Sequence, residues 1–477
     1  MTTTELTLPS AIPVVVEDRR VEEPMQWAPL LVVLAGVFMT TLDFFIVNVA
    51  IPSLQTDLHA SSAAVQFVVA GFGLAFAAGM ISAGRFGDLW GRRRIFSIGM
   101  ALFTLASALC GVAPSAATLI GARVIQGVAA ALILPQVLAI LSTVYDGPRR
   151  VRAFSAYGLT LGCAGVFGQL IGGGLIRLDL LGLGWRAIFL INVPVGVAAL
   201  AMARRVLPES RSPIAARLDP IGAVLITGTL VALVLPLVEG RAQGWPTWTY
   251  VCLAGSAVLA AITLLHQRGL HRVGGAPTLA LGLFRDRAFV VGALAGLVYA
   301  LATASFFLVL ALYLQQGQGL TPLASGVIFV PLGIGYFLVS AQSGKVAARI
   351  GAQVIALGGV VTAAGYLLLG ETAAHLGDAS VLWLLPGLIV AGAGLGLVMA
   401  PLPTITLQSV PVGDAAAASG VLSTAQQVGG ALGVAVVGIV FFGAGTVPVA
   451  FSHSLALLAA FPILAGAVIQ FLRRASR

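Results

Sequence analysis

The chain has 477 residues, of which 59% are hydrophobic and only 9% are Asp, Glu, Lys or Arg. A soluble protein of this length carries charges on about a quarter of its residues, so the composition excludes a soluble class. It indicates an all-α protein that crosses a lipid bilayer many times, because each helix satisfies its own backbone hydrogen bonds. The formal net charge of +9 does not indicate nucleic-acid binding, since the basic residues are scattered in short groups between apolar segments.

Fourteen apolar runs of about 18 residues or more predict fourteen membrane-spanning helices. Residues 1–27 precede them as a predicted cytoplasmic tail, because this segment is charged and contains no apolar core followed by a cleavage site. The predicted spans cover residues 28–51, 62–84, 94–113, 116–143, 152–176, 185–203, 218–238, 248–266, 288–314, 323–343, 352–370, 381–405, 415–442 and 450–472.

The placement of lysine and arginine predicts the orientation of these spans. With the N-terminus in the cytoplasm, 22 of the 26 basic residues lie in cytoplasmic segments, and the external loops hold only Arg177, Arg186 and Arg241. Positive charge collects on the cytoplasmic side of membrane proteins, so both termini are predicted to be cytoplasmic. One missed helix would reverse the side of every later loop, so the same bias supports the span count.

The chain contains an internal repeat. The stretch from Gly84 to Arg94, between spans two and three, is echoed at an offset of 260 by Gly344 to Gly351, between spans ten and eleven. Residues 169–173 and 426–430 match at an offset of 257. The repeat predicts two like-oriented six-helix bundles around a central cavity, the architecture of alternating-access transporters. The predicted units are a bundle over 28–203, a linker with two extra membrane helices over 204–287, a bundle over 288–472 and a cytoplasmic tail over 473–477.

Asp43 is the only carboxylate well inside a predicted span. An ionised Asp near the bilayer centre costs on the order of 2.5–3.5 kcal/mol, and desolvation favours its neutral form, so Asp43 is a candidate proton carrier. Arg123, the only basic residue inside a span, lies at a similar depth, and Gln126 follows it by one helical turn. An Asp43–Arg123 contact that breaks in another conformation would couple proton binding to a conformational cycle. A purely structural polar contact is the alternative.

These features resemble motifs of the major facilitator superfamily, and within it of the 14-span drug:proton antiporters. The resemblance covers nearly the whole chain. The matching residues are Leu42-Asp43 and 48–52 in span one, Gly84, Asp88, Gly91 and Arg92 after span two, 123–127 in span four, Gly168, Gly172 and Gly173 in span five, Trp185-Arg186 and 189–194 in span six, and 418–420 with 429–431 in span thirteen.

Three residues depart from the family pattern. Gln169 stands where the fifth-span motif usually has proline, which puts a proline-dependent bend of that helix in doubt. Ala348 takes the place of the aspartate in the second copy of the charged stretch. Gln426 stands where the subfamily commonly has arginine.

The resemblance implies that the charged stretch after span two is a conformational gate. Asp88 would pair with Arg92 and face the start of span thirteen near Ala415, while Gly84 and Gly91 permit close backbone approach and a tight turn. The alternative is a turn whose arginines anchor the loop in the cytoplasm.

Small and aromatic residues in the spans predict two further surfaces. Gly168, Gly172 and Gly173, with Gln169 among them, are predicted to face Gly429, Gly430 and Gly433 where the two halves close, although ordinary tight packing is the alternative. Aromatic side chains in spans can line a cavity or face lipid and core. The candidate substrate-cavity residues are Phe44, Asn48, Tyr157, Tyr299, Phe306 and Gln426.

The sequence therefore predicts a proton-coupled exporter of small amphipathic or hydrophobic compounds such as antibiotics. It would lie in the bacterial cell (inner) membrane, function as a monomer, need no cofactor or metal, and catalyse no reaction. An exporter of one specific metabolite, lipid or siderophore with the same fold is the alternative. The membrane subunit of a signalling or enzyme complex is another. A nucleotide-driven pump is disfavoured, since no Gly-x-x-x-x-Gly-Lys-[Ser/Thr] loop occurs.

Overall fold

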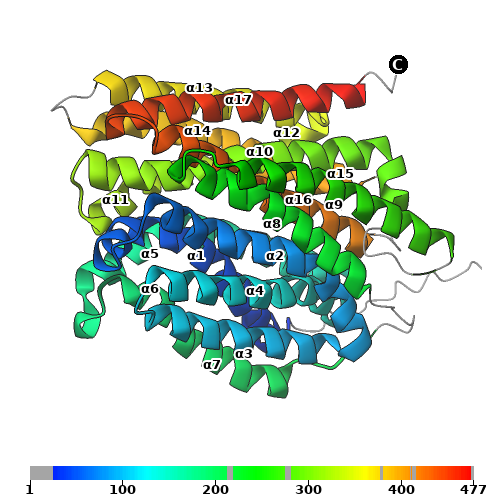
Figure 1. The fold of residues 1–477 in the computed structure, drawn as a ribbon. Helices are drawn as coiled ribbons and strands as arrows, with labels where there is room; N and C mark the ends of the chain where they lie inside the picture. Colours follow the sequence, from blue (N-terminus) through cyan, green and yellow to red (C-terminus); the bar gives the residue numbers. More distant parts are fainter. Residues whose placement is uncertain are drawn as a thin grey trace, which may run out of the picture.

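The structure, a computed structural model, describes residues 25–211, 219–273, 275, 281–375, 380–408, 410 and 415–473. Over these ranges the regular elements are helices, packed side by side (Figure 1). Thirteen are long and apolar enough to cross a membrane, or up to fourteen when a bent helix counts as one span. The predicted fourteen-span α-helical fold is therefore confirmed. The N-terminal tail up to residue 24 and the C-terminal tail from residue 474 lie outside the described residues.

The described helices form two bundles with a helix pair between them in sequence. The first bundle contains α1 (Trp27–Asp57), α2 (Ser62–Trp90), α3 (Arg92–Gly111), α4 (Ala116–Val144), α5 (Gly147–Leu178), η1 (Leu180–Gly182), η2 (Gly184–Arg186), α6 (Ala187–Leu190) and α7 (Asn192–Val206). The pair is α8 (Pro220–Ala242) and α9 (Thr247–Arg272), followed by η3 (Leu281–Arg285). The second bundle contains α10 (Arg287–Leu312), η4 (Tyr313–Gly317), α11 (Pro322–Ile328), α12 (Val330–Ile350), α13 (Gln353–His375), η5 (Val381–Leu384), α14 (Leu385–Met399), α15 (Pro401–Leu407), α16 (Ala415–Phe441) and α17 (Val447–Arg473).

Side-chain caps begin several of these helices. Ser115 and Thr118 form a reciprocal capping box at the start of α4. The Asp286 carboxylate accepts hydrogen bonds from the backbone N–H groups of Ala288 (2.8 Å) and Phe289 (3.3 Å) at the start of α10. Such caps satisfy donors that the first helical turn leaves free.

The charged stretch after span two is mostly helical. We expected the glycines to bound a turn, but α2 continues through Gly84 as far as Trp90, and only Gly91 leaves the helix, at φ +103°. Among the described residues, no atom lies within 4 Å of the position that a Gly84 Cβ would occupy. Residues 411–414, before span thirteen, lie outside the described residues, so the predicted close approach at Gly84 stays a prediction. Gly351, the repeat partner of Gly91, likewise ends α12 with a positive φ of +59°.

Helix α5 bends although it lacks the proline that the family motif usually has. The segments Arg152–Gly165 and Phe167–Leu178 meet at 47°. Large aromatic side chains pack against its glycines. Tyr336 and Phe337 pack against Gly162, and Phe45 packs against Gly165. Closely spaced glycines, which lack side chains that would hold a helix straight, accompany this bend in place of proline.

The two bundles meet at one end of the molecule. The Gln315 amide donates to the carbonyl oxygen of Val49 (2.9 Å), and the Gln316 amide donates to the side chain of Gln55 (3.2 Å). Helix α5 packs on α11 there, with Gly173 against the backbone of Pro322. These residues border the loops that follow α1 and η4, so the halves are closed at this end.

The glycines of spans five and thirteen do not face each other as predicted. In α5, Gly172 packs on α1, where Ile46 and Val49 cover it, and Gly173 packs on α11. In α16, Gly429 and Gly433 pack instead on the backbone of α10. The repeat correctly identifies equivalent positions in the two halves. However, the glycines of α5 and those of α16 mainly let each helix pack closely on the first helix of its own half.

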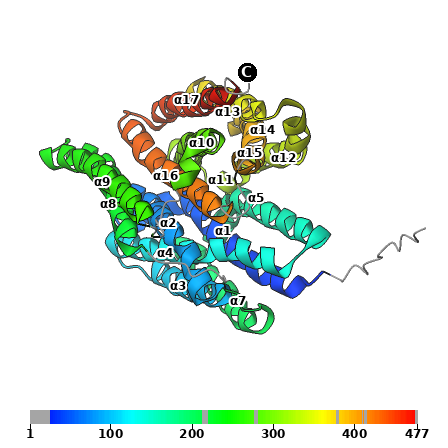
Figure 2. The same cartoon turned by 90° about the vertical axis from the view of Figure 1, so that its right-hand side faces the viewer.

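Helix α8 crosses the seam between the bundles. It packs on α2 of the first bundle, α16 of the second and its own partner α9. Val234 and Val238, in its last three turns, are buried. Seen roughly along the helices in Figure 2, α8 and α9 lie outside the two bundles.

The packing of Gly429 predicts a stability difference between two glycines of one helix. In Gly429→Ala the new Cβ would meet the carbonyl oxygen of Leu297, and such overpacking typically costs about 1–3 kcal/mol. The control Gly420→Ala, also in α16, meets nothing within 4 Å and should be neutral or stabilising, because alanine favours helices. Thermal unfolding in detergent measures both; equal melting temperatures would contradict the assigned packing.

Candidate functional site

The carboxylate of Asp43 forms the centre of a buried polar cluster in the first bundle. Arg123 of α4 forms an ion pair with Oδ2 through Nη1. The Gln126 amide donates to Oδ1 at 2.7 Å, and the Asn192 amide of α7 donates to the same oxygen at 3.0 Å. All four side chains are at most 1% exposed. The contact that the sequence predicted between Asp43, Arg123 and Gln126 is therefore present.

Helix α3 supplies the other side of this cluster. Ser107 Oγ accepts hydrogen bonds from the amides of Gln126 (2.8 Å) and Asn192 (3.3 Å). Gln126 Oε1 accepts from Arg123 Nη1 at 2.8 Å and lies 3.6 Å from Cys110 Sγ. Helices α1, α3, α4 and α7 thus converge on one carboxylate.

The guanidinium of Arg123 is held by the backbone and by aromatic rings as well as by Asp43. Its Nε donates to the carbonyl oxygen of Val68 in α2 at 3.0 Å. The guanidinium carbon lies 4.4 Å from the ring centre of Phe72 and 5.8 Å from that of Phe189. Nη2 is buried and has no hydrogen-bond partner among the described residues. The aromatic faces therefore supply cation–π attraction where a hydrogen bond is missing.

This geometry suits an ionised Asp43. Both carboxylate oxygens accept hydrogen bonds, and the only formal positive charge in the cluster faces Oδ2. Adding a proton would remove the ion-pair attraction and place a donor where donors already point. Asp43 is 0% exposed, so a proton can reach it only after a conformational change.

Sequence reasoning missed Asn192 and Ser107. Asn192 belongs to the stretch from Phe189 to Pro194 that carried part of the family resemblance, but the resemblance gave it no role. Ser107 is one small hydroxyl in an apolar run, and such residues usually bond to their own helix. The one available signal was the place of Asn192 within this matching stretch.

Residues next to Asp43 connect the cluster to the second bundle. The carbonyl oxygen of Phe45 accepts a hydrogen bond from the Gln169 amide of α5 at 2.8 Å. The Phe45 ring lies 4.8 Å from that of Phe307 in α10. Asn48, a predicted cavity residue, is 2% exposed and donates to the same carbonyl at 3.0 Å. Helix α1 therefore carries both Asp43 and, two residues further on, a contact with the second bundle.

The predicted gate residues lie at the opposite end of the bundle from the closed seam. Asp88 pairs with Arg92 at 3.2 Å, one helical turn apart in sequence. Residues 411–414, which precede α16, lie outside the described residues, and so do the side chains of 415–417. The predicted contact between Asp88 and the start of span thirteen thus stays a prediction.

Glu209, which the sequence did not indicate, holds the turn at Gly91. Its Oε1 accepts a hydrogen bond from the backbone N–H of Arg93 at 3.1 Å, and the backbone carbonyl oxygen of Ser210 accepts one from the N–H of Arg92 at 3.0 Å. The Glu209 carboxylate occupies the space that a Cβ on Gly91 would need, with Oε1 2.5 Å from that position. Gly91 is therefore required by its positive φ and by this contact.

Comparison with known proteins identifies the family. A family model described as Major Facilitator Superfamily matches residues 33–434. The chain belongs to the Major Facilitator Superfamily. A solved structure of a POT family transporter in complex with a thioalcohol conjugated peptide superposes with a TM-score of 0.69 at 13% identity, covering 94% of this chain and 96% of that one. That likeness shows the superfamily fold alone.

Curated relatives within the superfamily are more similar in sequence. The chain is 38% identical over 424 residues to a probable actinorhodin transporter of Streptomyces coelicolor, covering 88% of this chain and 73% of that protein. It is 35% identical over 453 residues to the puromycin resistance protein pur8 of Streptomyces alboniger, covering 91% and 86%. It is 34% identical over 407 residues to the multidrug resistance protein Stp of Mycobacterium tuberculosis, covering 85% and 74%. With its apolar helices, this superfamily member is a multi-pass protein of the bacterial inner membrane.

The predicted cavity residues of this superfamily member fall into two groups. Tyr299 and Phe306 are at most 1% exposed inside the second bundle, where Tyr299 bonds to Thr362 (2.8 Å) and Phe306 stacks on Tyr366. These two side chains are part of the core in this conformation. Phe44, Tyr157 and Gln426 are half-buried on α1, α5 and α16, so they remain the candidates for contact with a substrate.

The ion pair predicts a pH-dependent stability in one variant. Arg123→Gln leaves Asp43 without a counter-charge and should lower the free energy of unfolding by about 3–5 kcal/mol at pH 8. The loss should shrink at pH 5, because a protonated Asp43 needs no counter-charge. Thermal unfolding in detergent at both pH values measures this. The double variant Asp43→Asn/Arg123→Gln should show little pH dependence; a single variant equally unstable at both pH values would contradict the assignment.

Proposed function

We propose that the protein exports small amphipathic or hydrophobic compounds such as antibiotics from the cytoplasm, driven by the inward flow of protons. Its relatives support the cargo class, since their names describe resistance to or transport of actinorhodin, puromycin and several drugs. The observation that carries the proton coupling is the buried Asp43–Arg123 pair. No cofactor enters the scheme.

The arginine bias and the closed end together suggest which state the structure represents. The loops beside the closed seam are those that the bias assigns to the outside. With that orientation, the bundles are closed externally and the conformation is inward-facing. An Asp43 that bonds to Arg123, Gln126 and Asn192 in this state fits a carrier that has already released its proton to the cytoplasm.

Alternating access then follows from the charge of one side chain. In the outward-facing state, where the contact with Arg123 would be broken, Asp43 would take up a proton. When the protein returns to the inward-facing state, the restored contact with Arg123 would favour release of that proton to the cytoplasm. Each charge moved through 100 mV supplies about 2.3 kcal/mol, enough for a cargo gradient of roughly fifty-fold. Substrate would bind between the halves, near Phe44, Tyr157 and Gln426.

A narrower cargo is the second candidate. Other relatives are a tetracenomycin C resistance and export protein of Streptomyces glaucescens and a cephamycin export protein of Amycolatopsis lactamdurans, each named for one compound class. A susceptibility panel of chemically unrelated compounds in a pump-deficient host separates the two candidates. Protection against several classes supports multidrug export, and protection against one class supports a dedicated exporter.

Replacing Asp43 tests the proton coupling. Asp43→Asn keeps a hydrogen-bonding side chain of similar size but cannot carry a proton, so efflux driven by a pH gradient in liposomes should fall to the background rate. The control Asp57→Asn alters a carboxylate in the same helix that binds Trp185 and Arg186 near the loops, and should keep the coupling. Full coupling in Asp43→Asn would overturn Asp43 as the carrier.

Replacing Asp88 tests the proposed gate. Asp88→Ala removes the partner of Arg92 and should lower the transport rate several-fold while leaving drug affinity in detergent within about twofold, because the residue lies far from the proposed cavity. Asp146→Ala is the control, since Asp146 is an exposed carboxylate paired with Arg149 (2.6 Å) at the same end. Unchanged turnover in Asp88→Ala would leave only an anchoring role for this stretch.

A further inference from the structure

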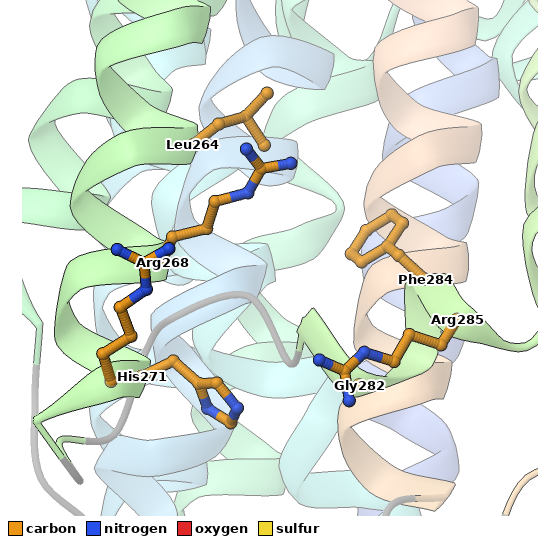
Figure 3. Close-up of a pocket in the computed structure, with 7 residues that line it drawn as sticks. Leu264, Arg268, His271, Gly282, Phe284 and Arg285 are labelled. Atoms are coloured by element: carbon orange, nitrogen blue, oxygen red, sulfur yellow. The ribbon is translucent and has the colours of Figure 1, made fainter.

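A basic cavity lies where the end of α9 meets η3, far from the Asp43 cluster. It has a volume of about 540 Å³. Figure 3 shows Arg268 and His271 of α9 on one side and Phe284 and Arg285 of η3 on the other. Its lining residues are Leu264, Arg268, His271, Arg272, Gly282, Phe284 and Arg285.

Positively charged side chains dominate the described lining of the cavity. Three arginines and a histidine line it, and the described lining residues include no Asp or Glu. Elsewhere at this end of the molecule, Arg92 pairs with Asp88, and Arg149 pairs with Asp146. Among the described residues, no ion pair joins a carboxylate to the arginines of the cavity. The cavity therefore favours an anion.

The position of α9 puts this charge at the membrane surface. The helix runs from Thr247 to Arg272, 26 residues, which corresponds to about 39 Å of helix against about 30 Å of hydrocarbon. Only 17% of its most apolar window is buried in protein, so most of it faces lipid. Trp248 and Tyr250 lie at its other end, where aromatic side chains mark the opposite surface. The last turns of α9 therefore lie at headgroup depth.

Apolar side chains line the same cavity beside the charges. Leu264 and Phe284 are each 46% exposed, so they offer an uncovered apolar surface next to the arginines. Leu264 lies one helical turn before Arg268 along α9, toward the bilayer interior. A ligand that places an anion against the arginines and hydrocarbon against Leu264 and Phe284 fits this arrangement.

We propose that this cavity binds the phosphate headgroup of an anionic phospholipid. Guanidinium groups bind phosphate oxygens through paired N–H donors, and basic pockets beside membrane helices bind anionic headgroups in this way. The acyl chains would run along α9 past Leu264 and Phe284. Simple anchoring by positive charge accounts for exposed arginines on a single helix, but not for arginines of two segments that line one cavity.

Lipid binding to the whole protein tests this assignment. Native mass spectrometry after detergent exchange should detect phosphatidylglycerol retained on the wild type, with phosphatidylcholine retained at least tenfold less. Arg268→Gln/Arg272→Gln/Arg285→Gln should lose at least tenfold in affinity for phosphatidylglycerol. The matched control Arg204→Gln/Arg205→Gln/Arg349→Gln removes three exposed basic residues at the same predicted membrane face outside the cavity, and should retain the lipid.

A second variant separates a lipid from a free anion. Leu264→Ser/Phe284→Ser keeps every charge, so it should weaken phosphatidylglycerol binding several-fold and leave any binding of inorganic phosphate unchanged. It also keeps the assignment testable if the triple variant fails to fold. Inorganic phosphate that competes with the lipid at equal concentration would indicate a soluble anion site and overturn the proposal. Equal retention of both lipids, or of phosphatidylglycerol by wild type and both variants, would overturn it as well.

Discussion

The ion pair between Asp43 and Arg123 is the interaction on which the first bundle depends. Removing two charges from water costs several kcal/mol each, and their attraction offsets this cost only when other hydrogen bonds complete the site. Gln126, Asn192 and Ser107 complete it here. Because these partners come from α3, α4 and α7, the pair determines where three helices sit against α1. A polar centre thus organises a bundle that is otherwise held by apolar packing.

When the pair breaks, the electrostatic cost of staying buried is not the same for Asp43 and Arg123. A protonated Asp43 is neutral and can remain buried, whereas the guanidinium of Arg123 stays charged at any physiological pH. What then remains for Arg123 is the carbonyl oxygen of Val68, the amide oxygen of Gln126 and the faces of Phe72 and Phe189, none of which carries a negative charge. Protonation therefore leaves a buried cation without a counter-charge, and rearrangement of the bundle can relieve this cost.

The sequence predicted the spans because each is a long apolar run, and it predicted the buried pair because a charge inside such a run is rare. It did not predict Asn192 and Ser107, since a single amide or hydroxyl in a membrane helix is common and its direction depends on packing. The glycine partners were assigned wrongly because a repeat reports which positions correspond, not which ones touch: Gly172 and Gly429 are equivalent, yet each packs within its own half. The length of α2 was underestimated because its last turns are charged and extend beyond the apolar run.

The position of α8 has a consequence for the membrane around the protein. Helix α8 packs on both α2 and α16. It cannot keep both contacts when the two bundles move apart. One face of α8 must then exchange protein neighbours for acyl chains, and return when the seam closes. The work of this exchange depends on how tightly the surrounding acyl chains are packed. Membrane fluidity and lateral pressure thereby enter the equilibrium between the two states of the protein.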